Sequence, residues 1–372
     1  MQYRLKDSLK EIYLNIRVML LSPFLLLRKT RIPEKKEIKT ILLLRHDRVG
    51  DMVFSTPLFM ALKKNFPDAR LTVLASQRNY GIIENNPNVD EILIYNGIGW
   101  FIKEVSKRGF DLVIDSFLDH ELKTAFLAYL TGAKYRMGFE ISGRQIFFNI
   151  KGPKGKDKRT VLEQTLDIAR SLGLTIQDSL PSLYLSEEER AEAWETLKKR
   201  GVDEGELLIG IHPGGYYESQ RWPAEKFASV EDRLISEYKA KVIIFGGEGD
   251  KDSLNIMKEK MTKSPIIIEH TGLRVFISLM SYCHLLLCNN SGPLHIATAL
   301  KIPTVSTMGP TVPYLWWPAG ESNIVLRKEI ECSPCNKGFC TGHECMELIT
   351  VDDMVGAVEK QLATISKRIT GY

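Results

Sequence analysis

The chain has 372 residues, and this length favours two domains over a single hydrophobic core. Hydrophobic residues make up 44% of it and charged residues 26%, which is typical of a globular protein and excludes a disordered or fibrous chain. The formal net charge is only +4, so the composition gives no support to nucleic-acid binding.

The first segment, residues 1–38, is basic and amphipathic. Residues 1–40 contain ten Lys or Arg and four Asp or Glu, so the basic excess of the chain lies here. Its apolar stretch is shorter than the roughly 20 residues that span a bilayer, and it lacks the small-residue cleavage site of a signal peptide. We predict an interfacial helix on an anionic membrane surface; a helix packed on the body of the protein is the alternative. One face of this helix would carry Leu9, Ile12, Tyr13, Ile16 and Leu20, and the other would offer Lys6, Lys10 and Arg17.

A first domain is predicted over residues 39–184. Apolar runs that suit buried strands alternate with helical patterns, which is typical of a parallel, doubly wound sheet. The boundary is placed where residues 180–183 break the pattern and Ser186 opens a new helix with a capping box. The expected strands are residues 41–44, 71–75, 92–95 and 112–115, and the expected helices are residues 58–66, 80–85, 100–107 and 160–172.

The turn after the first strand holds one carboxylate, Asp51, beside Gly50. A helix is expected to follow, capped by Ser55 or Thr56, with Pro57 in its first position. This order places Asp51 at the carboxyl edge of a parallel sheet, where open α/β sheets bind ligands. An ordinary surface aspartate in a loop is the alternative.

A second domain is predicted over residues 185–372, because the same alternation repeats there. The fold class is therefore α/β, with two doubly wound parallel sheets in tandem, and ligands favour the cleft between such domains. The expected strands are residues 207–211, 241–245, 266–268, 285–288, 304–308 and 324–326, and a final helix is expected over residues 351–365.

Two strand-to-helix junctions of the second half suit an anion. After residue 211 comes His212 with the paired glycines Gly214 and Gly215, whose backbone N–H groups can approach a ligand closely, and Arg221 follows as a fixed positive charge. After residue 288, Asn290 or Ser291 would cap a helix whose amino terminus is left open by Gly292.

His295 lies one turn beyond that cap and could reach the same ligand, although a buried histidine bonded to a carbonyl is the alternative. Asp250, in a third junction, could accept hydrogen bonds from a ribose. The dinucleotide-binding and P-loop glycine motifs are both missing from the sequence. These features together predict a diphosphate-bearing ligand on the second domain and Asp51 on the first.

The same motifs, taken in order, resemble glycosyltransferase family 9, the lipopolysaccharide heptosyltransferases, over residues 39–363. Each motif is weak alone, but the ordered set is specific. The motifs are Arg45-x-Asp47-Arg48-x-Gly50-Asp51 with Thr56-Pro57-Leu58, His212-Pro213-Gly214, Arg221-Trp222-Pro223, Gly246-Gly247-x-Gly249-Asp250, Asn289-x-Ser291-Gly292-Pro293-x-His295 and Met308-Gly309-Pro310-Thr311.

The resemblance implies the GT-B fold, with an acceptor-binding first domain and a second domain that binds a nucleotide sugar, typically ADP-heptose. It implies inverting transfer to a lipopolysaccharide core or related glycolipid, with no cofactor or catalytic metal, on the cytoplasmic face of the bacterial inner membrane. Asp51 becomes the expected general base. The expected substrate-binding residues are Arg45, Arg48, Gly50, His212, Gly214, Gly215, Gln220, Arg221, Asp250, Thr271, Gly272, Asn290, Ser291, Gly292 and His295.

Two positions depart from the family pattern. Gln220 stands where the family often has a lysine that reaches the donor phosphates, and Asn290 stands where it often has an aspartate. These changes leave the donor sugar open. A GT-B nucleotide-sugar 2-epimerase and a non-catalytic sugar-binding relative are the alternatives.

Four cysteines lie within fourteen residues, namely Cys332, Cys335, Cys340 and Cys345. Without an export signal, disulfides are not required, and the spacing departs from paired zinc-binding motifs. Structural thiols, reduced or disulfide-linked, are expected, and a structural zinc ion is the alternative.

Overall fold

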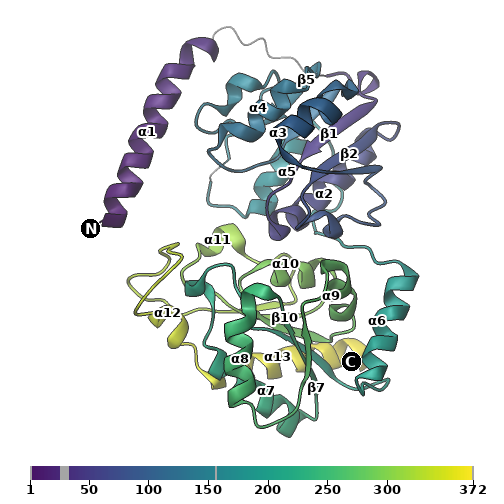
Figure 1. Ribbon diagram of the computed structural model, residues 1–372, viewed down its shortest axis with the longest axis vertical. Helices are drawn as coiled ribbons and strands as arrows, with labels where there is room; N and C mark the ends of the chain where they lie inside the picture. The colour runs from purple at the N-terminus through teal and green to yellow at the C-terminus, as the bar shows by residue number, and fades with distance from the viewer. Residues whose placement is uncertain (1, 26–32, 156, 371–372) are drawn as a thin grey trace. The chain divides into compact units, whose positions relative to one another are not determined.

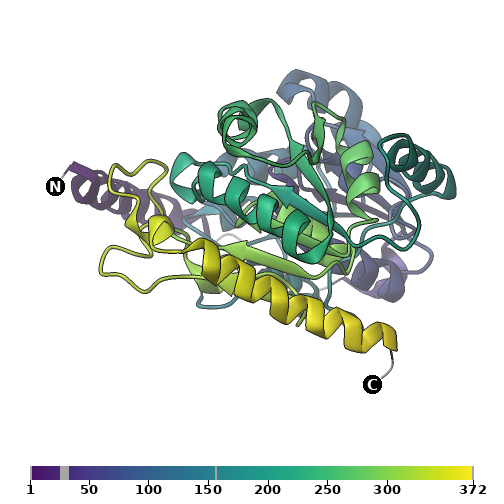
Figure 2. The same cartoon turned by 90° about the horizontal axis from the view of Figure 1, so that it is seen from below.

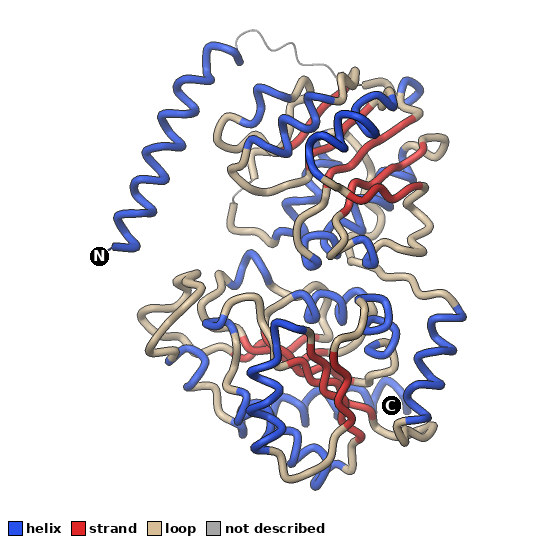
Figure 3. The backbone as a smooth tube through the Cα atoms, in the orientation of Figure 1, coloured by secondary structure: helices blue, strands red, loops and turns tan. Residues whose placement is uncertain are grey.

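The computed structural model describes residues 2–25, 33–155 and 157–370, and it divides into two compact units, residues 1–179 and 180–372 (Figure 1). The division falls directly before the segment 180–183 that the sequence marks as a break. Each unit is a parallel sheet with helices on both faces (Figure 3), as the sequence predicts. The α/β fold class with two parallel sheets is therefore confirmed.

The first unit contains a five-stranded sheet in the order β3-β2-β1-β4-β5, and every neighbouring pair is parallel. The strands are β1 (Thr40–Leu44), β2 (Arg70–Ala75), β3 (Glu91–Ile94), β4 (Leu112–Asp115) and β5 (Tyr135–Gly138). The sequence predicts the first four. It misses β5 because this short edge strand includes Arg136 and Gly138 and forms no apolar run.

Helices of the first unit pack in two groups. The helix α2 packs against α5, whereas α3, the π-helical turn after it and α4 share one apolar core with the strands, through buried side chains such as Phe101, Val105 and Ala125. The helices are α1 (Gln2–Leu25), α2 (Val49–Asn65), α3 (Gly97–Trp100), α4 (Leu122–Leu130) and α5 (Val161–Ser171).

The helix α2 begins earlier than the sequence predicts, so Asp51 lies in its first turn instead of a preceding loop. The predicted cap is wrong: Arg48 is the residue before the helix, and the Ser55 hydroxyl donates to the Asp51 carbonyl inside it at 2.9 Å. Pro57 lies in the helix interior, where it lacks the N–H that would reach the Val53 carbonyl. The Thr56 hydroxyl donates to that carbonyl at 2.8 Å, which restores the lost bond.

The second unit contains a six-stranded parallel sheet in the order β11-β10-β9-β6-β7-β8. The strands are β6 (Leu208–His212), β7 (Lys241–Gly246), β8 (Ile266–Glu269), β9 (Leu285–Asn289), β10 (Thr304–Thr307) and β11 (Asn323–Leu326), close to the six predicted. The helices are α6 (Glu187–Lys199), α7 (Ala224–Tyr238), α8 (Lys251–Lys260), α9 (Leu273–Met280), α10 (Gly292–Ala299), α11 (Pro313–Trp316), α12 (Glu344–Glu347) and α13 (Val351–Thr370).

The final helix α13 packs beside α7 and against β10 and β11, so it belongs to the second unit (Figure 2). Its buried residues join those of α7, α8 and the strands in one core.

In both sheets the direction of winding reverses at one point, between β1 and β4 in the first unit and between β6 and β9 in the second. Ligands of open α/β sheets bind outside the carboxyl ends of the strands at this switch point. The motifs that the sequence singles out follow β1, β6 and β9, so the topology carries them to the two switch points.

Candidate functional site

At the switch point of the first unit, Asp51 emerges from the first turn of α2, directly after β1. Its side chain keeps 12% of its surface exposed, and its Oδ1 lies 3.9 Å from Nη1 of Arg45. The pKa of Asp51 is raised to about 7, mainly by burial and then by the negative charge of Asp47, against the lowering effect of Arg45 and Arg48. Asp51 thus combines limited access to solvent with the proton affinity of a general base that works near neutral pH.

Arg45 is an interior residue and is only 1% exposed. One guanidinium nitrogen donates to the Ser116 carbonyl, which ties the end of β1 to the loop after β4, and Nη1 donates to Oδ2 of Asp47 at 3.0 Å. The Phe117 ring covers the group at 5.3 Å from its centroid. Arg45 is therefore a buried neighbour of Asp51, while Arg48 is exposed.

Beside this cluster lies a buried ion-pair network that the sequence does not reveal. Arg144 is fully buried and donates to Oδ2 of Asp115 at 2.5 Å and to Oδ1 of Asp119 at 2.9 Å. Asp115 ends β4, so it marks the same edge of the sheet as Asp51. The sequence could have pointed to Asp115, because it is a carboxylate at the end of a buried apolar run. Nothing in the sequence pairs it with Arg144, which lies 29 residues away.

Several buried polar atoms at this edge have no hydrogen-bond partner. They lie after β1, β2 and β5, and are Nε of Arg45, Nδ1 of His46, Oδ1 of Asp47, Oγ of Ser76 and Nε of Arg144. Such atoms are uncommon in folded proteins, since an unsatisfied buried polar group is costly. Their concentration here is the pattern expected of a site that receives a polar ligand.

At the switch point of the second unit, Asn289 holds the two loops together. Its Nδ2 donates to the carbonyls of Pro213 and Gly214, and its Oδ1 accepts from the Trp222 backbone N–H and the Thr307 hydroxyl. Asn289 ends the buried strand β9 and is fully buried. It belongs to the motif, although the sequence analysis gave it no role.

The junction after β9 differs in detail from the prediction. Ser291 precedes α10, but neither its side chain nor that of Asn290 caps the helix: the Ser291 hydroxyl donates to the Asn289 carbonyl, and Nδ2 of Asn290 donates to the Trp316 carbonyl at 3.1 Å. Gly292 and Pro293 open the helix. His295 is only 3% exposed, and burial lowers its pKa to about 4, so it is neutral at physiological pH.

Gly214, after β6, has no room for a side chain because that of Asp250 lies against it. A Cβ atom on Gly214 would lie 1.8 Å from Oδ1 of Asp250. Oδ2 of Asp250 accepts from the Gly247 N–H at 2.9 Å and lies 3.5 Å from Nε2 of His212. Burial lowers the pKa of His212 against the opposing effect of Asp250.

Arg221 braces the same two turns, since its guanidinium donates to the carbonyls of Gly215 and Gly249 at 3.0 Å each. Gln220 turns away from them and donates to the Thr311 hydroxyl at 3.1 Å. Thr271 and Gly272 are exposed between β8 and α9, where Gly272 is the residue before the helix. The structure thus gathers the predicted residues of the second half on four strand-to-helix junctions of one sheet edge.

Comparison with known proteins decides the family. The model of glycosyltransferase family 9 (heptosyltransferase) matches residues 98–345. The chain belongs to glycosyltransferase family 9. As a member it is a glycosyltransferase of the heptosyltransferase family.

Relatives of this family 9 chain match it over most of its length. The lipooligosaccharide heptosyltransferase 2 of Campylobacter jejuni (strain 81116) is 26% identical and covers 84% of this chain and 96% of its own length. The crystal structure of the family 9 glycosyltransferase from Veillonella parvula has a TM-score of 0.78 and 26% identity, and covers 89% of this chain and 99% of its own.

A third match confirms the fold. The structure of the E. coli ADP-heptose lipopolysaccharide heptosyltransferase II has a TM-score of 0.73 and 22% identity, and covers 88% of this chain and 99% of its own. The two-domain GT-B architecture implied by the sequence resemblance is thereby confirmed.

In this family 9 chain, the cysteine-rich loop packs on two of the motif turns. The Ser219 backbone donates to the Gly338 carbonyl, His343 contacts the Ser219 carbonyl at 3.0 Å, and the backbone N–H groups of Cys335 and Asn336 donate to the Pro310 carbonyl. The six cysteines are all free thiols, so no disulfide closes the loop. Within the described part of the chain, no three His, Cys, Asp or Glu side chains are arranged to hold a metal ion.

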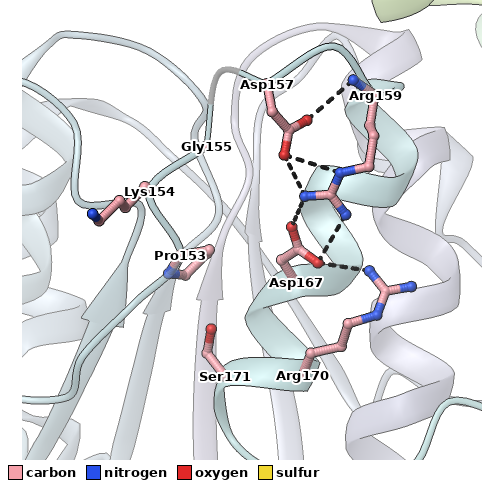
Figure 4. Close-up of a pocket in the computed structure, with 8 residues that line it drawn as sticks. All are labelled: Pro153, Lys154, Gly155, Asp157, Arg159, Asp167, Arg170 and Ser171. Atoms are coloured by element: carbon pink, nitrogen blue, oxygen red, sulfur yellow. Dashed lines mark hydrogen bonds and ion pairs between the residues drawn. The ribbon is translucent and has the colours of Figure 1, made fainter.

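A pocket of the first unit is lined by residues 153–155, 157, 159, 167, 170 and 171 (Figure 4). Its two carboxylates are paired, since Arg159 bonds Asp157 and Asp167, and Arg170 bonds Asp167 at 2.7 Å. None of the predicted site residues lines it. We therefore assign it no part in the transfer reaction.

Proposed function

We propose that the protein is an inverting, metal-independent glycosyltransferase that moves a heptose or related sugar from ADP-heptose to a lipopolysaccharide core or related glycolipid. The observation that carries this is Asp51: a carboxylate at a ligand-binding sheet edge, held with a pKa of about 7, in a chain of the heptosyltransferase family. The E. coli neighbour named for ADP-heptose supports the donor.

In this proposal residues 39–184 bind the acceptor and Asp51 is the general base. A hydroxyl of the acceptor sugar gives its proton to Asp51 as its oxygen attacks the anomeric carbon of the donor. The bond from that carbon to the diphosphate breaks on the opposite face, and the nucleoside diphosphate leaves with the electron pair. General-base assistance contributes roughly 10²–10⁴-fold to such a step.

Residues 185–372 bind the nucleotide sugar. Negative charge builds up on the leaving diphosphate, and the amino terminus of α10 together with Arg221 offers a positive potential without a metal ion. Asp250, packed on the backbone of Gly214, is the group for the ribose or sugar hydroxyls. Gln220 bonds Thr311, so Arg221 is the phosphate-binding cation of this turn.

We also propose that the enzyme works at the inner face of the cytoplasmic membrane, through α1. No helix in the described residues is both long and apolar enough to cross a bilayer. Arg17, on the less exposed face of α1, donates to the carbonyls of Ser142 and His120 at 2.9 and 2.6 Å, which ties the helix to loops at the catalytic edge of the first unit. On its other face α1 exposes the five predicted apolar side chains and also Met19 and Phe24, each between 48% and 66% exposed.

The test of the reaction is Asp51→Asn, which keeps the size of the side chain and removes its basicity. Transfer from ADP-heptose to a lipopolysaccharide acceptor should fall by roughly 10²–10⁴-fold, because the base is lost. Transfer is followed by mass spectrometry of the acceptor, and binding of ADP-heptose by calorimetry should be nearly unchanged.

Asp111→Asn is the control, since Asp111 bonds the opposite end of β1. Near-normal transfer by Asp51→Asn would refute the assignment of the base. Conversion of ADP-heptose without any acceptor would instead indicate an epimerase.

A further inference from the structure

The surroundings of Asp51 contain a second carboxylate, Asp47, that shares one cation with it. Nη1 of Arg45 lies 3.0 Å from Oδ2 of Asp47 and 3.9 Å from Oδ1 of Asp51. One guanidinium thus stands between two carboxylates and makes its hydrogen bond to Asp47. The Coulomb energy of two charges in a buried site depends steeply on their distance. The distance from the Arg45 guanidinium to Asp51 therefore determines how strongly Arg45 stabilises the negative charge of Asp51.

Arg45 is fixed from the other directions. A guanidinium nitrogen donates to the Ser116 carbonyl, the Phe117 ring covers the group, and the Asn79 side chain holds the Arg45 backbone carbonyl at 3.0 Å. The group is 1% exposed, so water competes little for it. Among the hydrogen bonds of its guanidinium, the one to Asp47 is the bond that a single side-chain substitution can remove.

The surroundings of Asp47 indicate that its negative charge has a function. It lies one turn of backbone ahead of the base, its side chain is 23% exposed, and Oδ1 is buried without a hydrogen-bond partner. A carboxylate with one unsatisfied oxygen beside another carboxylate is unfavourable for folding, since like charges repel and the oxygen has lost its water. Such a cost is common at functional sites.

We propose that Asp47 is a positioning residue which holds the Arg45 guanidinium away from Asp51, so that Asp51 keeps the proton affinity that a general base requires. The inference rests on the proposed role of Asp51 and adds a second residue to it. Asp47 itself transfers no proton and touches no reacting atom. When the charge of Asp47 is removed, Arg45 interacts with Asp51 as its main carboxylate partner. The anion of Asp51 is then more stable, and Asp51 is a weaker base.

Other charged groups face the same carboxyl group. On the loop and helix of Asp51, Arg48 favours the charged form; on the loop after β4, Asp119 opposes it. Arg144 pairs with Asp115 and Asp119, so its charge is directed to those carboxylates. His46 is kept neutral at physiological pH, because burial lowers its pKa to about 4. Of the two carboxylates that raise the pKa of Asp51, Asp47 has the larger effect and alone bonds Arg45.

The experiment compares Asp47→Asn with the wild type across pH. Asparagine keeps the size of the side chain but has no charge, so it attracts the Arg45 guanidinium much less strongly than the carboxylate does. The acid limb of kcat/KM should move to lower pH by about one unit, so that the activity at pH 6, as a fraction of its own maximum, rises about fivefold. The maximum itself should fall, because a weaker base accepts the proton less readily.

A second readout needs no substrate. Carboxyl ¹³C chemical shifts of labelled Asp51, assigned by comparison with Asp51→Asn, should titrate about one pH unit lower in Asp47→Asn than in the wild type. Asp47→Glu, which restores the charge, should return the titration toward the wild-type value. Asp68→Asn, which removes a carboxylate that is 82% exposed at the other end of the sheet, is the matched control and should change neither readout.

A lower maximum with an unmoved acid limb and an unmoved Asp51 titration would overturn the inference and leave Asp47 a purely structural residue. A shifted Asp51 titration in a protein that transfers no sugar would support the positioning role and refute the proposed function. The two failures are therefore distinguishable.

Discussion

Glu231 is a carboxyl group placed inside the core of the second unit. Its side chain is fully buried in α7. Its pKa is raised to about 8, mainly by burial and then by the neighbouring Asp232, while Lys263 opposes the shift. The folded protein holds this proton more tightly than the unfolded chain, whose carboxyl titrates near 4.5. The free energy of unfolding should therefore fall as pH rises from about 4.5 to about 8, with a slope of up to about 1.4 kcal/mol per pH unit from this group.

Glu231→Gln removes that titration and keeps the shape of the side chain. Urea unfolding, followed by fluorescence of the buried Trp222 in the same core, should show similar stability for both proteins at pH 5. At pH 8 the variant should be more stable by a few kcal/mol. This is roughly the slope of about 1.4 kcal/mol per pH unit multiplied by the interval from pH 5 to pH 8. Equal pH dependence in the two proteins would show that Glu231 is already ionised in the native state.

Single residues differ in how far the sequence predicts them. Asp51 and Gly214 stand in short strand-turn-helix patterns, and such local patterns fix both their position and their chemistry. Arg144 and Asn289 are different, because their partners lie 29 and 76 residues away in sequence. A hydrogen bond across that separation exists only after the strands have paired, and no local pattern encodes it.

At the scale of elements, α1 has two different faces. Its less exposed face, which includes Leu14, Arg17 and Leu21, packs toward the first unit, while the opposite face stays apolar and exposed. An exposed apolar face of this kind favours a second apolar neighbour. The net positive charge of residues 1–40 favours an anionic bilayer as that neighbour.

Leu20→Glu tests this surface, since Leu20 is 63% exposed on α1. Binding to vesicles that contain anionic lipid should weaken at least about tenfold, because a leucine leaves the interface and a like charge enters it. The measurement is co-sedimentation at low and high salt, and salt should weaken wild-type binding. Leu348→Glu, a leucine 50% exposed in the second unit, is the matched control. Unchanged vesicle binding together with loss of a dimer would instead assign the face to a second copy of the chain.

Strands are predicted best where they form an uninterrupted apolar run. The six strands of the second unit and four of the first follow their apolar runs. The predicted start of α2 is too late because Ser55, Thr56 and Pro57 suit the first positions of a helix, whereas they lie inside it. The buried residues Met52 to Phe54 belong to the helix too, and this brings Asp51 into its first turn.

For the whole molecule, the division into two units predicts that the substrates are bound separately. The proposed nucleotide-binding residues lie at the edge of the second sheet and the proposed base at the edge of the first. ADP alone, as a fragment of the donor, should therefore act on the second unit of the intact chain. Hydrogen exchange followed by mass spectrometry measures this segment by segment.

With ADP at a hundred times its dissociation constant, amides at residues 212–215 and 290–295 should exchange up to about a hundredfold more slowly, since exchange there requires ADP-free protein. Residues 45–54 should exchange at an unchanged rate, because in this proposal ADP binds to the second unit and these residues belong to the first. Arg221→Ala, which removes the phosphate-binding cation, should weaken the protection. Protection confined to residues 45–54 would reverse the assignment of donor and acceptor to the two units.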